Sequence, residues 1–106
     1  MSIKKKFKKP EECISLEDVR NEIDKIDRLI ISLFAERHKY IKEIVRFKSN
    51  YFNIRAEERK DKVIRQRKQW AEERGLDKET FAKIYELLIE SNIQQELKIF
   101  KSKLNK

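Results

Sequence analysis

The sequence has few of the residues that interrupt regular secondary structure. Glycine and proline each occur once in 106 residues. Because a β-sheet needs turn-forming residues every few positions, this scarcity argues against a sheet and favours long helices. A single cysteine excludes an internal disulfide bond and a cysteine-based metal site, and a single histidine is too little for a histidine-based one.

Long apolar runs are also missing. No run approaches the roughly 20 residues that a membrane-spanning helix needs, and no apolar stretch of a signal peptide follows the basic N-terminus. We therefore expect a cytoplasmic protein without a membrane partner. The length fits one domain, but a chain this short and polar buries only a modest core, so we also expect it to associate.

Positive charge is abundant, with a formal net charge of +8. A basic surface is compatible with nucleic acid, anionic lipid or a small anionic ligand as partner. Part of the excess lies in the lysine-rich residues 4–9. We interpret this run as a solvated, disordered arm. It belongs to a basic N-terminal arm, residues 1–14, which is followed by a helical domain in residues 15–106.

The first expected helix begins near Ser15, which is a suitable N-cap, and ends in the region of residues 49–53. It would have about 34 residues and be about 50 Å long, whereas a compact domain of this size is roughly 26 Å across. Its apolar positions form a stripe with helical spacing. The stripe comprises Val19, Ile23, Ile26, Ile30, Leu33, Ile41 and Ile44. Another chain must therefore cover much of this stripe.

Two further helices are expected. The second runs from near Ala56 to Arg74, with Gly75 as a left-handed C-terminal cap. The third is capped by Asp77 and runs from about Lys78 to about Lys101. The predicted fold class is all-α, with three helices per chain and a long first helix.

Polar residues interrupt the apolar faces of these helices. They are Arg37, Lys48, Arg59, Asn92 and Glu96. Taken singly, a long cation can lay its stem along apolar surface, and a buried Glu can pair with a buried Arg. As a set, however, they contain three cations and at most one anion, and burying unpaired charge costs several kcal/mol per ion. We therefore expect a dianionic small molecule to supply the missing negative charge.

Helical spacing suggests how such a ligand would be held. On one continuous helix, Arg37 and Lys48 would lie about 16 Å apart along the axis and about 20° apart around it. This leaves a gap suited to a benzene-sized ring with two carboxylates. Arg20 stands 17 residues before Arg37, about 25 Å away. Arg20 cannot reach a ligand at Arg37 of its own chain, but in an antiparallel dimer it could reach the site of the partner chain.

At these residues the sequence resembles the all-helical chorismate mutase family, including isochorismate pyruvate-lyases, over about residues 10–101. Arg20, Arg37 and Lys48 match the family's ligand-binding trio, and Arg59 matches an arginine of its second helix. The resemblance rests on "LEDVRNEIDKIDRLIISLFAERHKYIKEIVRFK", "RAEER", "WAEERGLD" and "LLIESNIQQE".

The resemblance implies an intertwined homodimer in which Arg20 completes the partner's site, with no metal or organic cofactor. Chorismate would rearrange to prephenate, or isochorismate would split into salicylate and pyruvate; we place the mutase first. Arg20 and Arg37 would clamp carboxylates with support from Arg59. Lys48 would donate to the breaking ether oxygen.

Three positions differ from well-known mutases. Glu96 falls where those enzymes carry Gln, so it would donate to the ether oxygen only when protonated. We predict that burial raises its pKa and that Lys48 opposes the rise. Ala56 and Lys60 replace acids that orient the substrate hydroxyl, which leaves the choice of substrate open. Asn92, one turn before Glu96, is a further candidate substrate contact.

Two other classes compete with an enzyme. A nucleic-acid-binding helical module would use the positive charge on an outer face, and would leave Arg37 and Lys48 unexplained. A purely structural helical dimer would explain the long first helix but would bury unpaired cations. We therefore expect no nucleic-acid partner.

Overall fold

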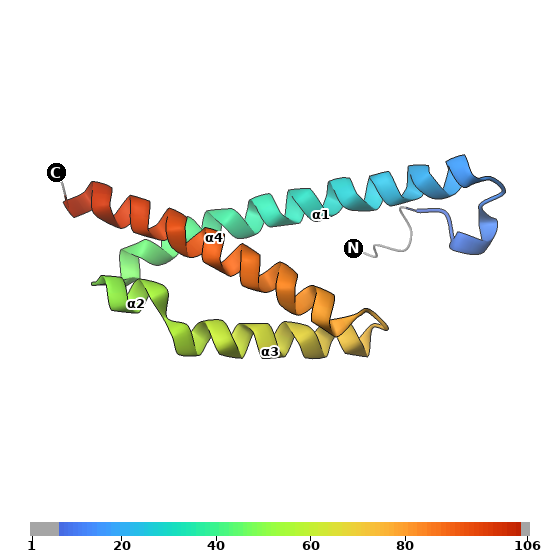
Figure 1. Cartoon of the computed structure of the whole chain (residues 1–106). Helices are drawn as coiled ribbons and strands as arrows, with labels where there is room; N and C mark the ends of the chain where they lie inside the picture. Colours follow the sequence, from blue (N-terminus) through green and yellow to red (C-terminus); the bar gives the residue numbers. More distant parts are fainter. Residues whose placement is uncertain (1–6, 105–106) are drawn as a thin grey trace. The chain divides into compact units, whose positions relative to one another are not determined.

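A computed structural model of the chain describes residues 7–104, apart from the side chains of Tyr51 and Phe52. Within these residues there are helices and connecting segments but no strand (Figure 1). The expected all-α fold class is therefore confirmed. The chain divides into two compact units, Met1–Arg37 and His38–Lys106, each described separately.

The first unit contains a short 3-10 helix, η2 (Pro10–Glu12), and most of helix α1 (Leu16–Ile44). The backbone N–H of Asp18 donates to Ser15 Oγ at 3.0 Å, so Ser15 is the helix cap that the sequence predicts. In return, the Asp18 carboxylate accepts a hydrogen bond from the backbone N–H of Ile14 at 3.2 Å. These two bonds satisfy backbone donors that a helix start leaves without partners inside the helix.

The segment before α1 contacts that helix. The backbone N–H of Lys8 donates to the Glu22 carboxylate at 2.6 Å, and Lys25 pairs with the same carboxylate at 2.9 Å. The ion pair with Lys25, followed by the hydrogen bond from the Lys8 backbone, holds the pKa of Glu22 below its ordinary value. The expectation of a disordered arm is therefore wrong at Lys8, while residues 1–6 lie outside the described residues.

The apolar stripe of α1 is exposed when the chain is considered alone. Within the first unit its side chains are 39–56% exposed: Val19, Ile23, Ile26, Ile30 and Leu33. A row of this kind is unfavourable in water, and natural surfaces seldom leave large apolar patches uncovered. The expectation that a second chain covers it stays a prediction.

The first helix ends earlier than its sequence pattern suggests. α1 has 29 residues and is followed by a 3-10 turn, η3 (Val45–Phe47). Lys48 is extended, with φ −112° and ψ 131°. The prediction that one helix continues to residues 49–53 is therefore wrong.

A short extra helix explains this early end. Asn50 Oδ1 accepts a hydrogen bond from the backbone N–H of Asn53 at 2.9 Å, which caps helix α2 (Tyr51–Arg55). An asparagine side chain bonded in this way favours the start of a new helix over continuation of the old one. Burial of Ile54, 1% exposed, then fixes α2 against the second unit's core.

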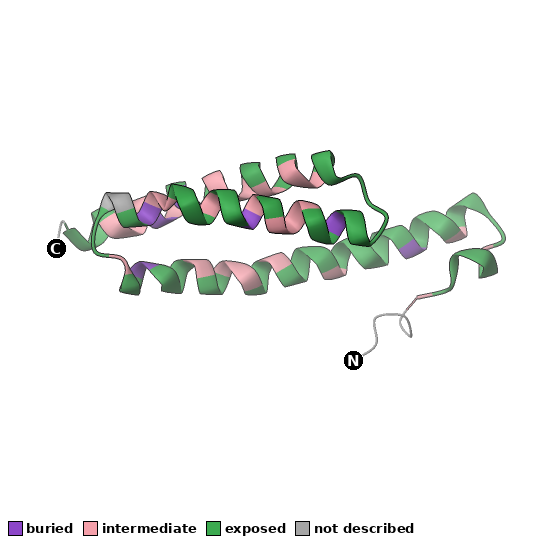
Figure 2. Ribbon diagram, turned by 90° about the horizontal axis from the view of Figure 1, so that it is seen from below, coloured by how far each residue is buried: buried purple, intermediate pink, exposed green. Residues whose placement is uncertain are grey.

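The second unit is built around a helical hairpin, α3 (Glu57–Glu73) and α4 (Lys78–Leu104). Helix α4 packs against α3, α2 and η3. The core is modest, as the composition predicts, and Figure 2 shows its buried positions on the ribbon. Its buried apolar residues are Val45, Ile54, Val63, Ala71 and Ile93. In the described part of the chain, no helix combines the length and apolar character needed to cross a membrane.

The hairpin turn forms as predicted. Gly75 has φ +75°, and the backbone N–H of Leu76 donates to the carbonyl of Ala71 at 2.9 Å. This pattern is the left-handed C-terminal cap that glycine adopts at low steric cost. Asp77 then caps α4 by accepting a hydrogen bond from the backbone N–H of Thr80 at 3.0 Å.

Candidate active site

Lys48 and Glu96, singled out separately in the sequence, lie together in the structure. Lys48 Nζ is 3.3 Å from Glu96 Oε1 and donates to the backbone carbonyl of Ile54 at 3.4 Å. The Lys48 side chain is 21% exposed and that of Glu96 only 6%. Glu96 Oε1 has no hydrogen-bond partner among the described residues. The contact between Lys48 and Glu96 is therefore an ion pair and not a hydrogen bond. A positive donor and a buried carboxyl are thus held side by side.

The environment of Glu96 changes its acidity. Burial raises the pKa of the carboxyl above its ordinary value, and the positive charge of Lys48 opposes this rise. The prediction made from the sequence is confirmed in both parts. The carboxyl therefore keeps its proton to a higher pH than an exposed glutamate, although Lys48 limits the effect.

Asn92 shares the buried face of α4 with Glu96. The two residues are four positions apart, which places them one above the other on a helix. Asn92 is 6% exposed and Glu96 4%, so both face inward as the spacing predicts. An amide and a carboxyl at this spacing supply hydrogen-bonding groups on one buried face, and the carboxyl lies beside Lys48.

Arg59 does not face the interior. Its side chain is exposed, although Val63, four residues later, is buried. The expectation of an inward Arg59 is therefore wrong. On a helix, the position three residues before Val63 shares its face as well as the position four residues before it does. The residue three before is Lys60, whose side chain is only 18% exposed. With Arg59 outside and Lys48 matched by Glu96, the excess inward charge is smaller than the sequence suggests.

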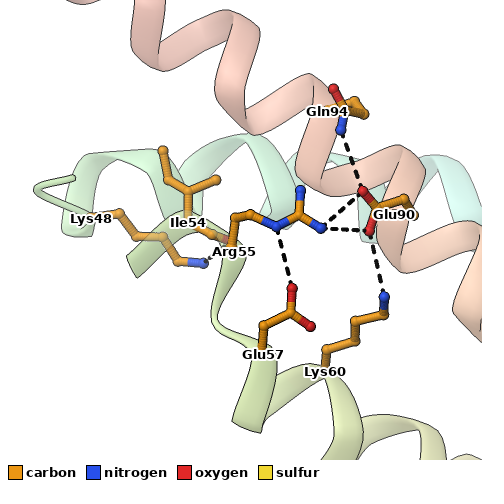
Figure 3. A network of polar contacts seen from close by, with 7 residues as sticks. All are labelled: Lys48, Ile54, Arg55, Glu57, Lys60, Glu90 and Gln94. Carbon is orange, nitrogen blue, oxygen red and sulfur yellow. Dashed lines mark hydrogen bonds and ion pairs between the residues drawn. The ribbon is translucent and has the colours of Figure 1, made fainter. Parts of the chain in front are cut away.

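A second polar cluster was missed by the sequence reasoning (Figure 3). Arg55 Nη2 donates to both Glu90 oxygens at 3.1 Å, and Lys60 Nζ lies 3.5 Å from the same carboxylate. Glu57 accepts from Arg55 Nε at 3.3 Å. Gln94 donates to Glu90 Oε1 at 3.4 Å. The hydrogen bond from Arg55 leads the interactions that hold the pKa of Glu90 below its ordinary value. The central pair of the cluster, Arg55 and Glu90, is 35 positions apart, so helical spacing does not reveal it.

Arg20 and Arg37 lie on α1, and the helix is continuous between them. Their expected separation of about 25 Å along the axis is therefore retained. Arg20 is exposed and Arg37 half-buried. The 16 Å estimate for Arg37 and Lys48 no longer applies, because Lys48 lies beyond the end of the helix.

Comparison with known proteins assigns the chain to a family of enzymes. The family model described as chorismate mutase type II matches residues 19–97, and the chain belongs to this family. Its members act on the small anions chorismate or isochorismate. Among curated proteins, the isochorismate pyruvate lyase of Pseudomonas aeruginosa is 35% identical over 95 residues, which cover 90% of this chain and 94% of the relative.

The raised pKa of Glu96 predicts a pH-dependent stability. Stabilisation by a carboxyl whose pKa rises on folding is full below the ordinary value of 4.5 and is lost as pH rises through the folded value. Glu96→Gln cannot ionise, so its stability relative to wild type should increase from pH 4 to pH 8. Urea unfolding at one fixed protein concentration measures this difference.

Glu86→Gln serves as the control, because it removes an exposed carboxylate from the same helix. It should show a smaller change over the same range. A stability difference for Glu96→Gln that does not vary with pH would contradict the prediction.

Proposed function

We propose that the chain is a chorismate mutase that converts chorismate to prephenate. The observation that carries the proposal is the contact between Lys48 and Glu96, two polar groups brought together from different elements at the edge of the core. The family match over residues 19–97 supports it. Excess positive charge gives weaker support, since Glu96 balances Lys48 whenever its carboxyl is ionised and Arg59 is exposed.

The proposed reaction is pericyclic, so it needs no nucleophile and no covalent intermediate. The site holds a flexible dianion in its folded, reactive conformation, which lowers the entropic part of the barrier. As the ether C–O bond breaks, negative charge develops on its oxygen. Lys48 and protonated Glu96 donate to this oxygen, and each well-placed donor contributes about 3 kcal/mol.

The remaining candidates bind the substrate. Arg37 and the partner's copy of Arg20 clamp the two carboxylates, because guanidinium groups bind carboxylates through paired hydrogen bonds. Asn92 supplies a polar contact beside Glu96. Arg59 remains a proposed contact, and its exposed side chain would turn inward on binding. This mechanism uses neither a metal nor an organic cofactor.

The proposed enzyme is a homodimer whose helical domain occupies residues 15–106. Two features of α1 support a dimer. Its apolar stripe is exposed in the chain alone, and about 25 Å of helix separate Arg20 from Arg37. One chain therefore offers two arginines too far apart for one ligand, whereas two antiparallel chains offer a matched pair at each end.

Isochorismate pyruvate-lyase activity is the second candidate. It is favoured by the 35% identity to the Pseudomonas aeruginosa lyase over nearly the full length of both chains. Ala56 and Lys60 also favour it, since neither provides an acid to accept a hydrogen bond from the chorismate hydroxyl. The lyase would split isochorismate into salicylate and pyruvate at the same ether bond.

Product analysis tests the proposal directly. Purified protein given chorismate should form prephenate, and Lys48→Met should lower kcat by about a hundredfold because it removes one transition-state donor. Lys98→Met, an exposed residue of α4, is the matched control and should retain full activity. Salicylate and pyruvate formed from isochorismate alone would favour the lyase. Consumption of neither substrate would refute both activities.

A mixing experiment tests whether each site spans two subunits. Arg20→Ala and Arg37→Ala should each be inactive alone, but a heterodimer of the two retains one intact site. If subunits exchange randomly in an equal mixture, about a quarter of all sites are intact by dimer symmetry. Steady-state assays after exchange should therefore recover about a quarter of wild-type activity. No recovery after verified exchange would place both arginines in one chain's site.

The protonation of Glu96 predicts the pH profile of turnover. Because only the protonated carboxyl donates a hydrogen bond, kcat should fall as pH rises through its raised pKa. Glu96→Gln donates at any pH, so its profile should lack this limb. Initial rates from pH 5 to pH 9 at saturating substrate measure both profiles. Flat profiles for both proteins would exclude a role for the proton.

A further inference from the structure

Lys48 depends on a neighbouring segment for its orientation. It lies outside any helix, and its ammonium contacts two groups, the Glu96 carboxyl at 3.3 Å and the Ile54 carbonyl at 3.4 Å. The carbonyl belongs to α2, a helix of five residues. A helix this short has little stability of its own. The position of Ile54 must therefore be fixed by contacts to other parts of the unit.

The backbone just after Ile54 is also unfavourable by itself. Ala56 has φ +40° and ψ 58°, a left-handed conformation in which a Cβ atom crowds the backbone. It joins α2 directly to α3. Such a conformation persists only where surrounding contacts determine it. Burial of the Ile54 side chain is one such contact, and the charged residues on either side of Ala56 provide others.

Glu90 gathers those charged residues onto α4 (Figure 3). It binds Arg55, on one side of Ala56, through two bonds of 3.1 Å, and Lys60, on the other side, at 3.5 Å. Both bonds to Glu90 come from one nitrogen, Arg55 Nη2, while Nε donates to Glu57, so two carboxylates hold the guanidinium in place. Glu90 and Glu96 lie on the same helix, so α4 holds both the Lys48 partner and this anchor.

We propose that Glu90 is a positioning residue for Lys48. By binding Arg55 and Lys60, Glu90 clamps the α2–α3 junction and so fixes the position of the Ile54 carbonyl. That carbonyl accepts a hydrogen bond from the Lys48 ammonium and directs it toward Glu96. The effect on catalysis rests on the proposed function, whereas the effect on the Lys48–Glu96 contact does not. Glu90 is not a catalytic residue in this scheme, because it acts through Arg55, Lys60 and Ile54.

The cluster is better suited to positioning than to overall stability. The side chains of Arg55 and Glu90 are 39% and 38% exposed, and ion pairs in contact with water add little to folding stability. Their value lies in geometry, since one carboxylate ties two residues that flank a strained backbone position. Small displacements of a donor reduce rate strongly, by up to about a hundredfold for 1 Å.

Glu90→Gln is the test, with the titration of Glu96 followed by carbon NMR of labelled carboxyl groups. Without the clamp, Lys48 should leave Glu96, and the Glu96 pKa should rise because the ammonium no longer lowers it. Loss of the Glu90 charge alone would lower that pKa, so a rise is specific to movement of Lys48. With substrate, kcat should fall about tenfold while KM stays within about twofold.

Glu79→Gln is the matched control. It makes the same chemical change on the same helix and breaks the pair between Glu79 and Lys68, 3.2 Å apart, which also joins α4 to α3. It should leave the Glu96 titration and kcat unchanged. Arg55→Gln breaks the clamp from the other side and should lower kcat as Glu90→Gln does, which guards against loss of fold in one variant. Its Glu96 pKa should also rise, but loss of the Arg55 charge alone would raise it, so the rise in Glu90→Gln is the decisive one.

The two measurements separate this proposal from the proposed function. A Glu96 pKa that is unchanged or lower in folded Glu90→Gln overturns the clamp, whatever Arg55→Gln shows and even if the wild-type protein turns over chorismate. A raised pKa in both, in a protein that consumes neither substrate, supports the clamp and refutes only the enzymatic role.

Discussion

The second unit depends on one electrostatic constraint, the burial of the Glu96 carboxyl beside a single ammonium group. A carboxylate that is 4% exposed loses most of its hydration, and it must either find a cation or keep its proton. Lys48 supplies the cation from a point just past the end of α1. After the early end of that helix, the 3-10 turn and the carbonyl of Ile54 in the short α2 place the lysine beside α4.

The same contact sets the chemistry available to the proposed enzyme. Burial raises the pKa of Glu96 and Lys48 lowers it, so a stronger ion pair would leave the carboxyl ionised and unable to donate. A weaker one would leave it protonated but without a neighbouring cation to stabilise developing negative charge. The site therefore needs a lysine that is held close and yet is free enough to turn toward a ligand. A partly exposed ammonium on extended backbone meets both needs.

Local rules accounted for most of the fold. Ser15, Gly75 and Asp77 act within a few residues of their own positions, so capping preferences alone located three helix ends. Inward positions on α4 followed from periodicity, because this long helix keeps one face against α3. The end of α1 did not follow, because it depends on burial of Ile54, a tertiary contact, as well as on the local cap at Asn50.

The site was harder to predict than the fold because its geometry is nonlocal. Periodicity gave two equivalent neighbours of Val63, three and four residues before it, and the structure turned Lys60 rather than Arg59 inward. Glu90 and Arg55 are 35 positions apart. In sequence both look like ordinary solvated charges on helical surfaces, and no local rule pairs them.

The choice of substrate follows a different logic from the bond-breaking step. Both candidate reactions break an ether C–O bond, and Lys48 with Glu96 would stabilise the oxygen equally in each. The two substrates differ in the position of a ring hydroxyl. In the proposed mechanism, neither Lys48 nor Glu96 contacts this hydroxyl. Of the two residues proposed to lie near that hydroxyl, Ala56 has no hydrogen-bonding side chain, and Lys60 is already paired with Glu90. In the proposed enzyme, substrate preference would therefore depend on Ala56 and Lys60, and rate on Lys48 and Glu96.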